Sequence, residues 1–523
     1  MSWRIFPLLA AFLLVIGVPF LLRPAGGSST PAPGIPRLII ITPHVSQISA
    51  EFGPAFEAWH KRTYGTDVAI DWRGPLGTSE IIKLLQSQYV AAVRRGEIRP
   101  NGECKPGTID YDIVFGGGSF DHGRLKAGEG VTVSESIDGK VVQRNIPMSV
   151  PAGFAQEKLD AWFGQNKIGS ALLYDPQQFW IGTALSGFGI VFNRDLLGRL
   201  GLKDPTSFED LADPRLQGMV ALADPRQSGS ISTAFDAILS NYGWDKGWRL
   251  LREMCANARY FTNSSTKPPI DISLGEGAIG LAIDFYGRSQ AQAIARPGED
   301  PAHVRVGYVD PKGTASIDAD PISILRGGPN PEIARRFVEF VLTIEGQSLW
   351  NFPVQNADSP RLDGVVLGPK HYQLRRMPIR RVMYEKYADY LIDKVNPYEL
   401  ASDVKPAGWR SALGIMMGAF AIDNSHEQRE AWKALNLARG DGHFPAETLA
   451  KMEAAFYAWP VTPDAASSDP SKALAFTPEN FKQIRDRWRV AQRRYEIDYT
   501  MFFRAQYEEV LRLYNEARAS QKS

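Results

Sequence analysis

Short apolar runs alternate along the chain with longer segments whose apolar residues recur every three or four positions. Residues 37–42 (RLIIIT) are predicted to form a buried parallel strand, and residues 49–64 a helix. A second strand is predicted at residues 67–72, a second helix from 79 to about 93, and a third strand at residues 111–115. Strands and helices in this order are typical of a doubly wound sheet, whose ligands bind at the carboxyl ends of the strands.

The alternation resumes after residue 180 and predicts a second α/β unit. Two segments, residues 304–308 and 320–325, are then predicted to return to the first sheet as strands, followed by an amphipathic helix at residues 331–343. A chain that leaves one unit and returns to it forms two lobes joined by more than one strand, and we expect a cleft between them. The predicted elements of the second unit are strands at 187–193, 219–223 and 278–284, a short helix at 207–212, and a helix that opens in the turn 224–230 and reaches about 242.

The fold class that we predict is α/β, with two doubly wound lobes around a ligand cleft. Beyond about residue 375 the pattern changes to long helical segments, clearest at residues 478–519, which predict an accessory helical region. Residues 94–109 and 121–150 fit neither lobe, and we interpret them as surface insertions. The expected boundaries are residues 37–180 with 300–374 for lobe 1, 181–299 for lobe 2, and 375–523 for the helical region.

The N-terminus is predicted to be an export segment. Residues 5–22 form one apolar run between Arg4 and Arg23, long enough for a short membrane span of about 17 to 20 residues. Arg4 favours a cytoplasmic N-terminus, whereas Arg23 stands where a cleavage site needs small residues, and no Cys follows to accept a lipid. We therefore expect residues 1–23 to be retained as a membrane anchor, followed by a linker at 24–36; a removed signal peptide is the alternative.

Composition narrows the function classes. The chain has 523 residues, more than one core of typical size, with 59 Lys+Arg against 58 Asp+Glu and a net charge of +1. This balance lacks the basic footprint that holds phosphate backbones, so we expect no nucleic-acid partner. Cys104 and Cys255 are too few for a disulfide framework or a Cys-based zinc site, and we expect two unpaired or buried thiols, with a single bridge as the alternative.

A series of motifs in a fixed order carries a family resemblance. Each motif is weak alone, but their joint order over residues 38–352 is specific. The motifs are TPHVSQI at 42–48, an aromatic helix with Phe56 and Trp59, YGTDV at 64–68, GTALSGFGIVFNRDLL at 182–197, DPTSFEDLADPRLQGMVALADPRQSGS at 204–230, GEGAIGLAIDFYGRSQ at 275–290 and GGPNPEIARRFVEFVLTIEGQSLW at 327–350.

In these motifs the chain resembles the family 1, iron(III)-type extracellular solute-binding proteins, which have the type 2 periplasmic binding protein fold. The resemblance implies a periplasmic or envelope location, an ABC permease and an ATPase as partners, and lobes that close on a captured solute. Two departures matter. The helical region after residue 375 is longer than the usual family ending, and Asp284, Phe285 and Tyr286 stand where ferric-iron members carry adjacent tyrosines.

Glycine and hydroxyl residues gather at three strand-to-helix turns, residues 77–79, 117–119 and 228–230. Glycine lets the backbone approach a ligand, while free N–H groups and the positive helix end attract a carboxylate or phosphate. Ordinary N-capping by Thr78 and Ser228 is the alternative. The predicted ligand-binding residues are Thr42, His44, Gly77, Thr78, Ser79, Gly118, Ser119, Ser186, Ser228, Ser230, Asp284 and Tyr286.

His44, Asp284 and Tyr286 form a second candidate set, for a ferric ion as cargo, because ferric ion favours oxygen ligands and tolerates imidazole. The alternatives are a hydrogen-bonded turn residue for His44 and a cleft-wall aromatic for Tyr286. Since Phe285 replaces one expected tyrosine, we expect an organic anion as cargo. We expect no resident cofactor.

Motifs for catalysis are missing from the sequence. It contains no G-x-S-x-G, H-E-x-x-H or G-x-x-x-x-G-K-[ST]. Ser119, Asp121 and His122 lie too close in sequence to converge as a triad. We therefore expect a solute-binding protein of an importer rather than an enzyme, with a membrane-anchored ligand sensor or adaptor of the same fold as the alternative.

Overall fold

The computed structural model describes residues 34–74, 77–137, 140–296, 299, 303–311, 313–464, 467 and 469–522. The predicted anchor and most of the linker fall on residues 1–33, outside the described residues, so the anchor stays a prediction. None of the helices in the described ranges is long and apolar enough to cross a membrane.

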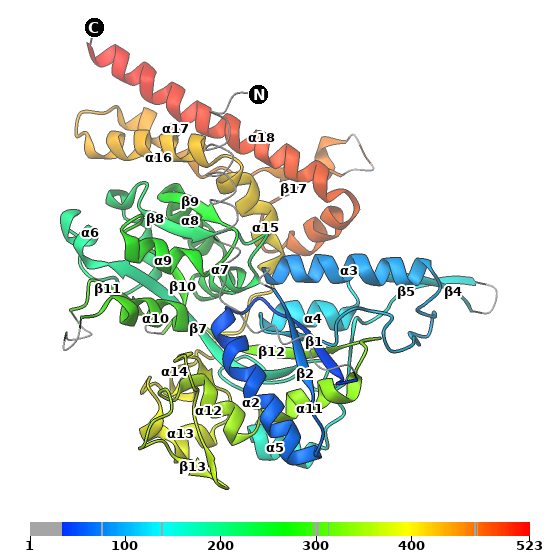
Figure 1. Cartoon of the computed structure of the whole chain (residues 1–523). Helices are drawn as coiled ribbons and strands as arrows, with labels where there is room; N and C mark the ends of the chain where they lie inside the picture. Colours follow the sequence, from blue (N-terminus) through cyan, green and yellow to red (C-terminus); the bar gives the residue numbers. More distant parts are fainter. Residues whose placement is uncertain are drawn as a thin grey trace, which may run out of the picture.

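One continuous sheet runs through the molecule (Figure 1). In its first half β1 is parallel to both β2 and β3, while β12 is antiparallel to β3 and to β7. The strand order is β2 (Ala69–Arg73), β1 (Arg37–Ile41), β3 (Ile113–Phe115), β12 (Ile317–Leu325) and β7 (Ile181–Asn193). We call this half of the sheet, with the helices on it, the first lobe.

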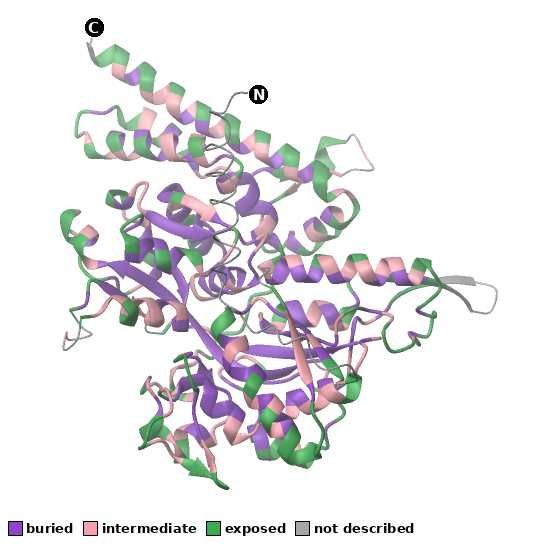
Figure 2. Ribbon diagram, viewed as in Figure 1, coloured by how far each residue is buried: buried purple, intermediate pink, exposed green. Residues whose placement is uncertain are grey.

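The strand β7 passes from the first half of the sheet into the second. Its residues 181–187 pair with β12, and its residues 188–192 pair with β10. All of β7 is buried, as Figure 2 shows. The second half continues through β10 (Ile279–Ile283), β8 (Val220–Ala223) and β9 (Ala258–Thr262). We call it, with its helices, the second lobe; the lobe boundaries expected from the sequence stay a prediction.

Helices cover both faces of the first lobe because each strand divides its side chains between two cores. Ile113 and Phe115 of β3 lie in the core with α2 (Ser46–Tyr64), whereas Val114 lies in the core with α3 (Thr78–Arg94). The helix α2 also contacts α11 (Pro331–Val341) and α12 (Ile344–Asn351). Other helices of the two lobes are α5 (Gln156–Phe163), α6 (Arg194–Arg199), η1 (Phe208–Ala212), η2 (Pro214–Leu216), α7 (Gly229–Tyr242), α8 (Trp244–Ala256), α9 (Lys267–Leu274) and α10 (Asp284–Ile294).

Residues 304–308 belong to the second lobe, so the prediction that they return to the first sheet was wrong. They contribute to β11 (Val306–Val309), which pairs antiparallel with the second half of β7. The reason is that β7 is long enough to serve both lobes, and β11 reaches its far end directly after α10. The later strand β12 does return to the first sheet, as predicted.

The segment 121–150 is not a surface insertion as predicted. Its first part forms α4 (Ser119–Ala127), which contacts β12, and β6 (Ser149–Val150) also pairs with β12. Only the hairpin of β4 (Thr132–Ile137) and β5 (Lys140–Asn145) extends outward (Figure 1). The sequence hides α4 because its buried side chains include polar Asp121 and His122, which break the apolar pattern.

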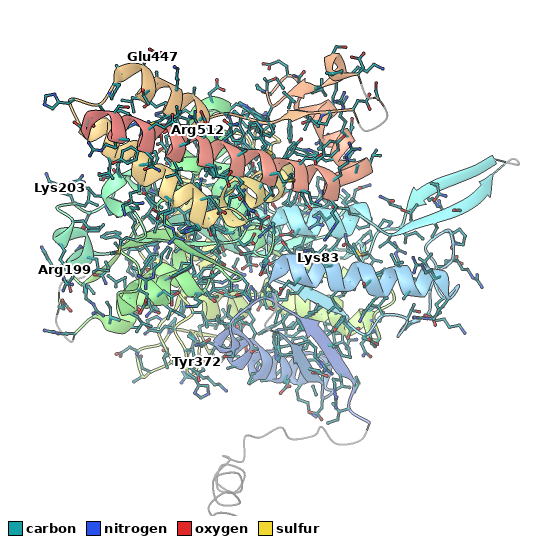
Figure 3. All side chains as sticks on the ribbon, turned by 90° about the horizontal axis from the view of Figure 1, so that it is seen from above. Lys83, Arg199, Lys203, Tyr372, Glu447 and Arg512 are labelled. Atoms are coloured by element: carbon teal, nitrogen blue, oxygen red, sulfur yellow. The ribbon has the colours of Figure 1, made fainter. Side chains whose placement is uncertain are left out.

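After residue 375 the chain first runs as short elements and then as long helices. Among the short elements, β15 (Met377–Pro378) pairs with β7. The C-terminal helical region, residues 410–522, follows; Figure 3 shows α16 to α18 side by side, with Arg512 on α18 and Glu447 on α17. Its helices are α15 (Arg410–Met417), η4 (Gly418–Ile422), α16 (Ser425–Gly440), α17 (Ala446–Phe456), the short η5 (Pro470–Lys472) and α18 (Phe481–Lys522), after the short α13 (Val382–Lys386), η3 (Ala388–Tyr390) and α14 (Pro397–Leu400).

The C-terminal helical region shares a hydrophobic core with the second lobe. Arg252 of α8 is buried between them: it donates to the carbonyl oxygens of Phe456 and Ala458, and its guanidinium lies 4.0 Å from the ring of Trp459. Both cysteines are unpaired in the structure. The predicted accessory region is therefore helical but is joined to the second lobe by a common core.

Candidate functional site

A cavity of about 750 Å³ opens where the two lobes meet. Its walls come from the loops after β1, β2 and β3 and from β12 in the first lobe, and from the start of α7, the loop after β9 and the start of α10 in the second. Most of the predicted ligand-binding residues line it. They are Thr42, His44, Gly77, Thr78, Gly118, Ser186, Ser228, Ser230 and Tyr286, whereas Ser79, Ser119 and Asp284 are not part of the lining.

The N-termini of α3, α4 and α7 meet at this cavity. The three helix N-termini can come this close only because glycine has no side chain. A Cβ on Gly117 would lie 2.7 Å from Cγ2 of Thr78, and a Cβ on Gly229 would lie 2.0 Å from Oδ2 of Asp121. Gly117 also has a positive φ of 112°, which L-residues rarely adopt. The structure thus brings the three predicted turns together, while their binding of a ligand stays a prediction.

Some of the N–H groups at these turns already have acceptors within the protein. The amide of Gly77 donates to Glu80, that of Gly117 to Asp320 and that of Ser119 to Asp318, at 3.1, 3.0 and 3.2 Å. The amides of Thr78, Gly118 and Ser230 donate to no group among the described residues. These three residues line the cavity, and unengaged amides at helix N-termini are the kind of donor that binds anions.

Hydroxyl groups add to these amide donors, but some of the hydroxyls predicted to bind a ligand are engaged within the protein. Thr42 Oγ1 is engaged, because it donates to the carbonyl of Phe115 at 2.7 Å and accepts from the amide of His44. Ser228 Oγ caps α7 weakly, at 3.5 Å from the amide of Ile231, which is the capping role weighed above. Thr78 does not cap α3, since the N-cap is Gly77.

Sequence reasoning missed the loop Asn263 to Thr266, which follows β9 and lines the cavity from the second lobe. It supplies a side-chain amide and three hydroxyls, and Ser264 Oγ lies 2.9 Å from Thr266 Oγ1. The NSST sequence after a strand was the available signal.

A buried charged group forms another wall. The guanidinium of Arg376 pairs with the carboxylate of Asp320 and lies 3.8 Å from the ring of Phe285, and Asp320 Oδ2 is 3.2 Å from His44 Nε2. Burial lowers the pKa of Arg376 to about 10, so it stays a cation at neutral pH. Burial and the charge of Arg376 hold the pKa of His44 well below 6.5, so its imidazole is neutral. Arg376 and Asp320 were both missed from the sequence.

Only two of the three residues of the predicted ferric site lie at the cavity. His44 and Tyr286 line the cavity, but Asp284 is fully buried outside its lining. Burial raises the pKa of Asp284 to about 7, partly offset by Arg288. Burial also raises the pKa of the Tyr286 phenol, partly offset by Arg376, which disfavours the phenolate that ferric ion needs. No group of three or more His, Cys, Asp or Glu in the described part of the chain could hold a metal ion.

Ser119, Asp121 and His122 have separate partners. Ser119 Oγ donates to Asp318, and the two ring nitrogens of His122 lie within hydrogen-bond distance of Ser323 Oγ and the carbonyl of Gly116. Their hydrogen bonds do not link them into a triad within the described structure.

Parts of this chain are similar to known proteins. Residues 153–362 match the model of a family described as bacterial extracellular solute-binding protein. An uncharacterized protein of Haemophilus influenzae is 32% identical over 170 residues, 32% of this chain and 46% of that protein. The phosphoglycerate transport regulatory protein PgtC of Salmonella typhimurium is 25% identical over 189 residues, 35% of this chain and 45% of PgtC. The chain thus spans a little less than half the length of these curated relatives.

A solved structure, the periplasmic binding protein AfuA of Actinobacillus pleuropneumoniae with exogenous fructose-6-phosphate bound, aligns with 19% identity and a TM-score of 0.42, over 60% of this chain and 81% of AfuA. The family matched is one of binding proteins rather than enzymes, which agrees with the sequence-based expectation. Over residues 153–362 the chain is therefore similar to the bacterial extracellular solute-binding proteins.

Proposed function

We propose that the chain is the extracytoplasmic solute-binding subunit of an ABC-type importer, which captures a small oxyanionic solute between its lobes. The observation that carries the proposal is the meeting of three helix N-termini at one interlobe cavity, with the amides of Thr78, Gly118 and Ser230 unengaged by described residues. Helix N-termini attract anions through these amides and the helix dipole. The matched family, described as bacterial extracellular solute-binding protein, supports an extracytoplasmic location. Delivery to a membrane permease driven by an ATPase is part of the proposal.

The size of the cavity supports an organic solute over a bare ferric ion. About 750 Å³ falls within the usual range for small-molecule sites, and a metal ion alone would leave most of it empty. Phosphoglycerate, in the name of the relative PgtC, is an organic solute of this size, although its carboxylate gives it a second anionic group.

Charges on the wall favour a solute with one anionic group and several hydroxyls. Among the described lining residues Arg376 is the cation, against the carboxylates of Glu80, Asp318 and Asp320. Each of these carboxylates accepts a backbone N–H, and Asp320 also pairs with Arg376. A polyanion would face them at close range, whereas a hydroxyl can donate to them.

A thermal-shift screen of the purified protein tests the proposal. The panel is 3-phosphoglycerate, fructose 6-phosphate, inorganic phosphate, citrate and ferric citrate. We expect a phosphorylated organic solute to stabilise the fold by about 2.7 kcal/mol at a hundredfold excess over its Kd. Ser230→Leu should abolish the shift because its side chain enters the cavity, whereas Ser87→Leu, on the exposed face of α3, should keep it. No shift with any solute would contradict the proposal.

A further inference from the structure

The C-terminal helical region reaches into the junction between the lobes through Arg410, the first residue of α15. Its guanidinium donates to Thr233 Oγ1 at 2.6 Å and to the carbonyl of Gly229 at 2.8 Å, both on α7 of the second lobe. It also lies 4.3 Å from the ring centre of Phe120, on α4 of the first lobe. One side chain from outside the family match therefore contacts both lobes, beside the turn of residues 224–230 before and into α7, called here the α7 turn, which contributes to the cavity wall.

Arg410 is surrounded by carboxylates from both lobes. Asp121 and Asp318 belong to the first lobe and Asp236 to the second, and all three are buried. Burial raises the pKa of each of them, and the positive charge of Arg410 partly offsets that rise. Oδ2 of Asp121 and Oδ1 of Asp236 have no hydrogen-bond partner among the described residues. The other nearby cation, Arg124, lies 3.6 Å from Asp121.

Closing the lobes brings these carboxylates together, which is unfavourable unless a cation lies between them. Asp236 belongs to the second lobe and Asp318 to the first, and the charge of Asp318 raises the pKa of Asp236, so their repulsion depends on the distance between the lobes. Arg410 supplies the compensating charge where they meet.

A second arginine, Arg226, also joins the α7 turn to the helical region. Arg226 pairs with Asp224 in the same turn and with Asp423, between η4 and α16, at 2.8 and 3.0 Å. This second tie joins the turn to the helical region without reaching the first lobe, so of the two arginines it is Arg410 that spans the junction.

We propose that Arg410 is a positioning residue of the solute site, through which the C-terminal helical region clamps the α7 turn of the second lobe against α4 of the first. The clamp rests on the proposed function for its ligand, and it assigns the helical extension a part in capture. Loss of the arginine should favour the open arrangement of the lobes.

The test compares Arg410→Gln and Arg410→Lys with Arg439→Gln in the whole protein. Arg439 is a matched control because it is a partly buried arginine of α16 that pairs with Glu453 of α17, inside the helical region. Calorimetry with 3-phosphoglycerate and fructose 6-phosphate gives Kd, and small-angle scattering without solute gives the radius of gyration. We expect Arg410→Gln to weaken binding about tenfold and to enlarge the protein, because a charge-assisted contact between the lobes is lost.

Arg410→Lys should recover part of the affinity because it keeps the charge, and Arg439→Gln should match the wild type in Kd and in scattering. Equal affinity and equal scattering for Arg410→Gln and wild type would overturn the clamp. If the wild type binds neither solute, the proposed function fails for them, and the scattering comparison alone decides on the clamp. Should Arg410→Gln not fold, Phe120→Ala, at a 42% exposed residue, removes the first-lobe contact instead and should give a smaller change of the same sign.

Discussion

Gly77 lies at a close contact between the lobes. Adding one methyl group there should hinder closure of the lobes without changing the fold of either lobe. Its φ of −63° suits any residue, so alanine brings no backbone strain. A Cβ at this position would lie 2.6 Å from the carbonyl oxygen of Gln227 and 3.6 Å from that of Asn263, both in the second lobe. Neither atom belongs to a flexible side chain that could turn aside.

The size of the effect follows from this distance. The oxygen of Gln227 would have to retreat by roughly 0.8 Å to reach an ordinary contact of about 3.4 Å. Overpacking of this kind costs about 1–3 kcal/mol. Because the clash exists only when the lobes are closed, Gly77→Ala should weaken solute binding about tenfold to a hundredfold, with little change in the melting temperature of the solute-free protein.

Calorimetry with the tightest-binding solute of the panel measures this effect. Gly198→Ala, in α6 of the second lobe, is the control, since a methyl there meets nothing within 4 Å. It should bind like the wild type. If Gly77→Ala also binds like the wild type, the lobes do not close as the structure shows them, and the reasoning is refuted.

Arg376→Met should weaken binding of a phosphorylated solute at least about tenfold by removing the cation and leaving Asp320 uncompensated, while Arg375→Met, which removes a contact with Asp393 instead, should keep the calorimetric Kd. Asp284→Asn should change the pH profile of stability: because burial raises the folded-state pKa to about 7, the folded protein holds a proton that the unfolded chain releases, and stability falls as pH rises from about 4 to 7. Urea unfolding at pH 5 and pH 8 should show a smaller difference for this variant, and an unchanged difference would count against a buried acid. Titration with ferric citrate should give no visible charge-transfer band; a saturable band that Tyr286→Phe removes would restore iron as the cargo.

Local patterns predicted most of the sheet because buried strands such as β1 and β10 are unbroken apolar runs. The strand β7 was predicted too short, at 187–193, because its first part contains Thr183 and Ser186. These residues are buried by tertiary contacts: the carbonyl of Thr183 accepts from the side chains of Gln347 and Trp350. The sequence near residue 183 contains no sign of those distant partners.

The candidate site likewise has a part that the sequence predicted and a part that it did not. Its turns were predictable, since glycine and hydroxyl residues directly after a strand are a local signal. Arg376 and Arg410 were not, because each reaches the site from a segment that looks like accessory sequence, and long-range packing alone places them there. Asp318 and Asp320 were missed for a similar reason: on β12 they are buried polar residues whose partners, Ser119 and Arg376, lie far away in sequence.

A crystal structure of the protein grown with the phosphorylated solute of the panel that gives the largest thermal shift tests the central claim most directly. We predict the anionic group at the amides of Thr78, Gly118 and Ser230, between the N-termini of α3, α4 and α7. A solute bound elsewhere, or an interlobe cavity left without solute at saturating concentration, would contradict capture of an oxyanion by these turns.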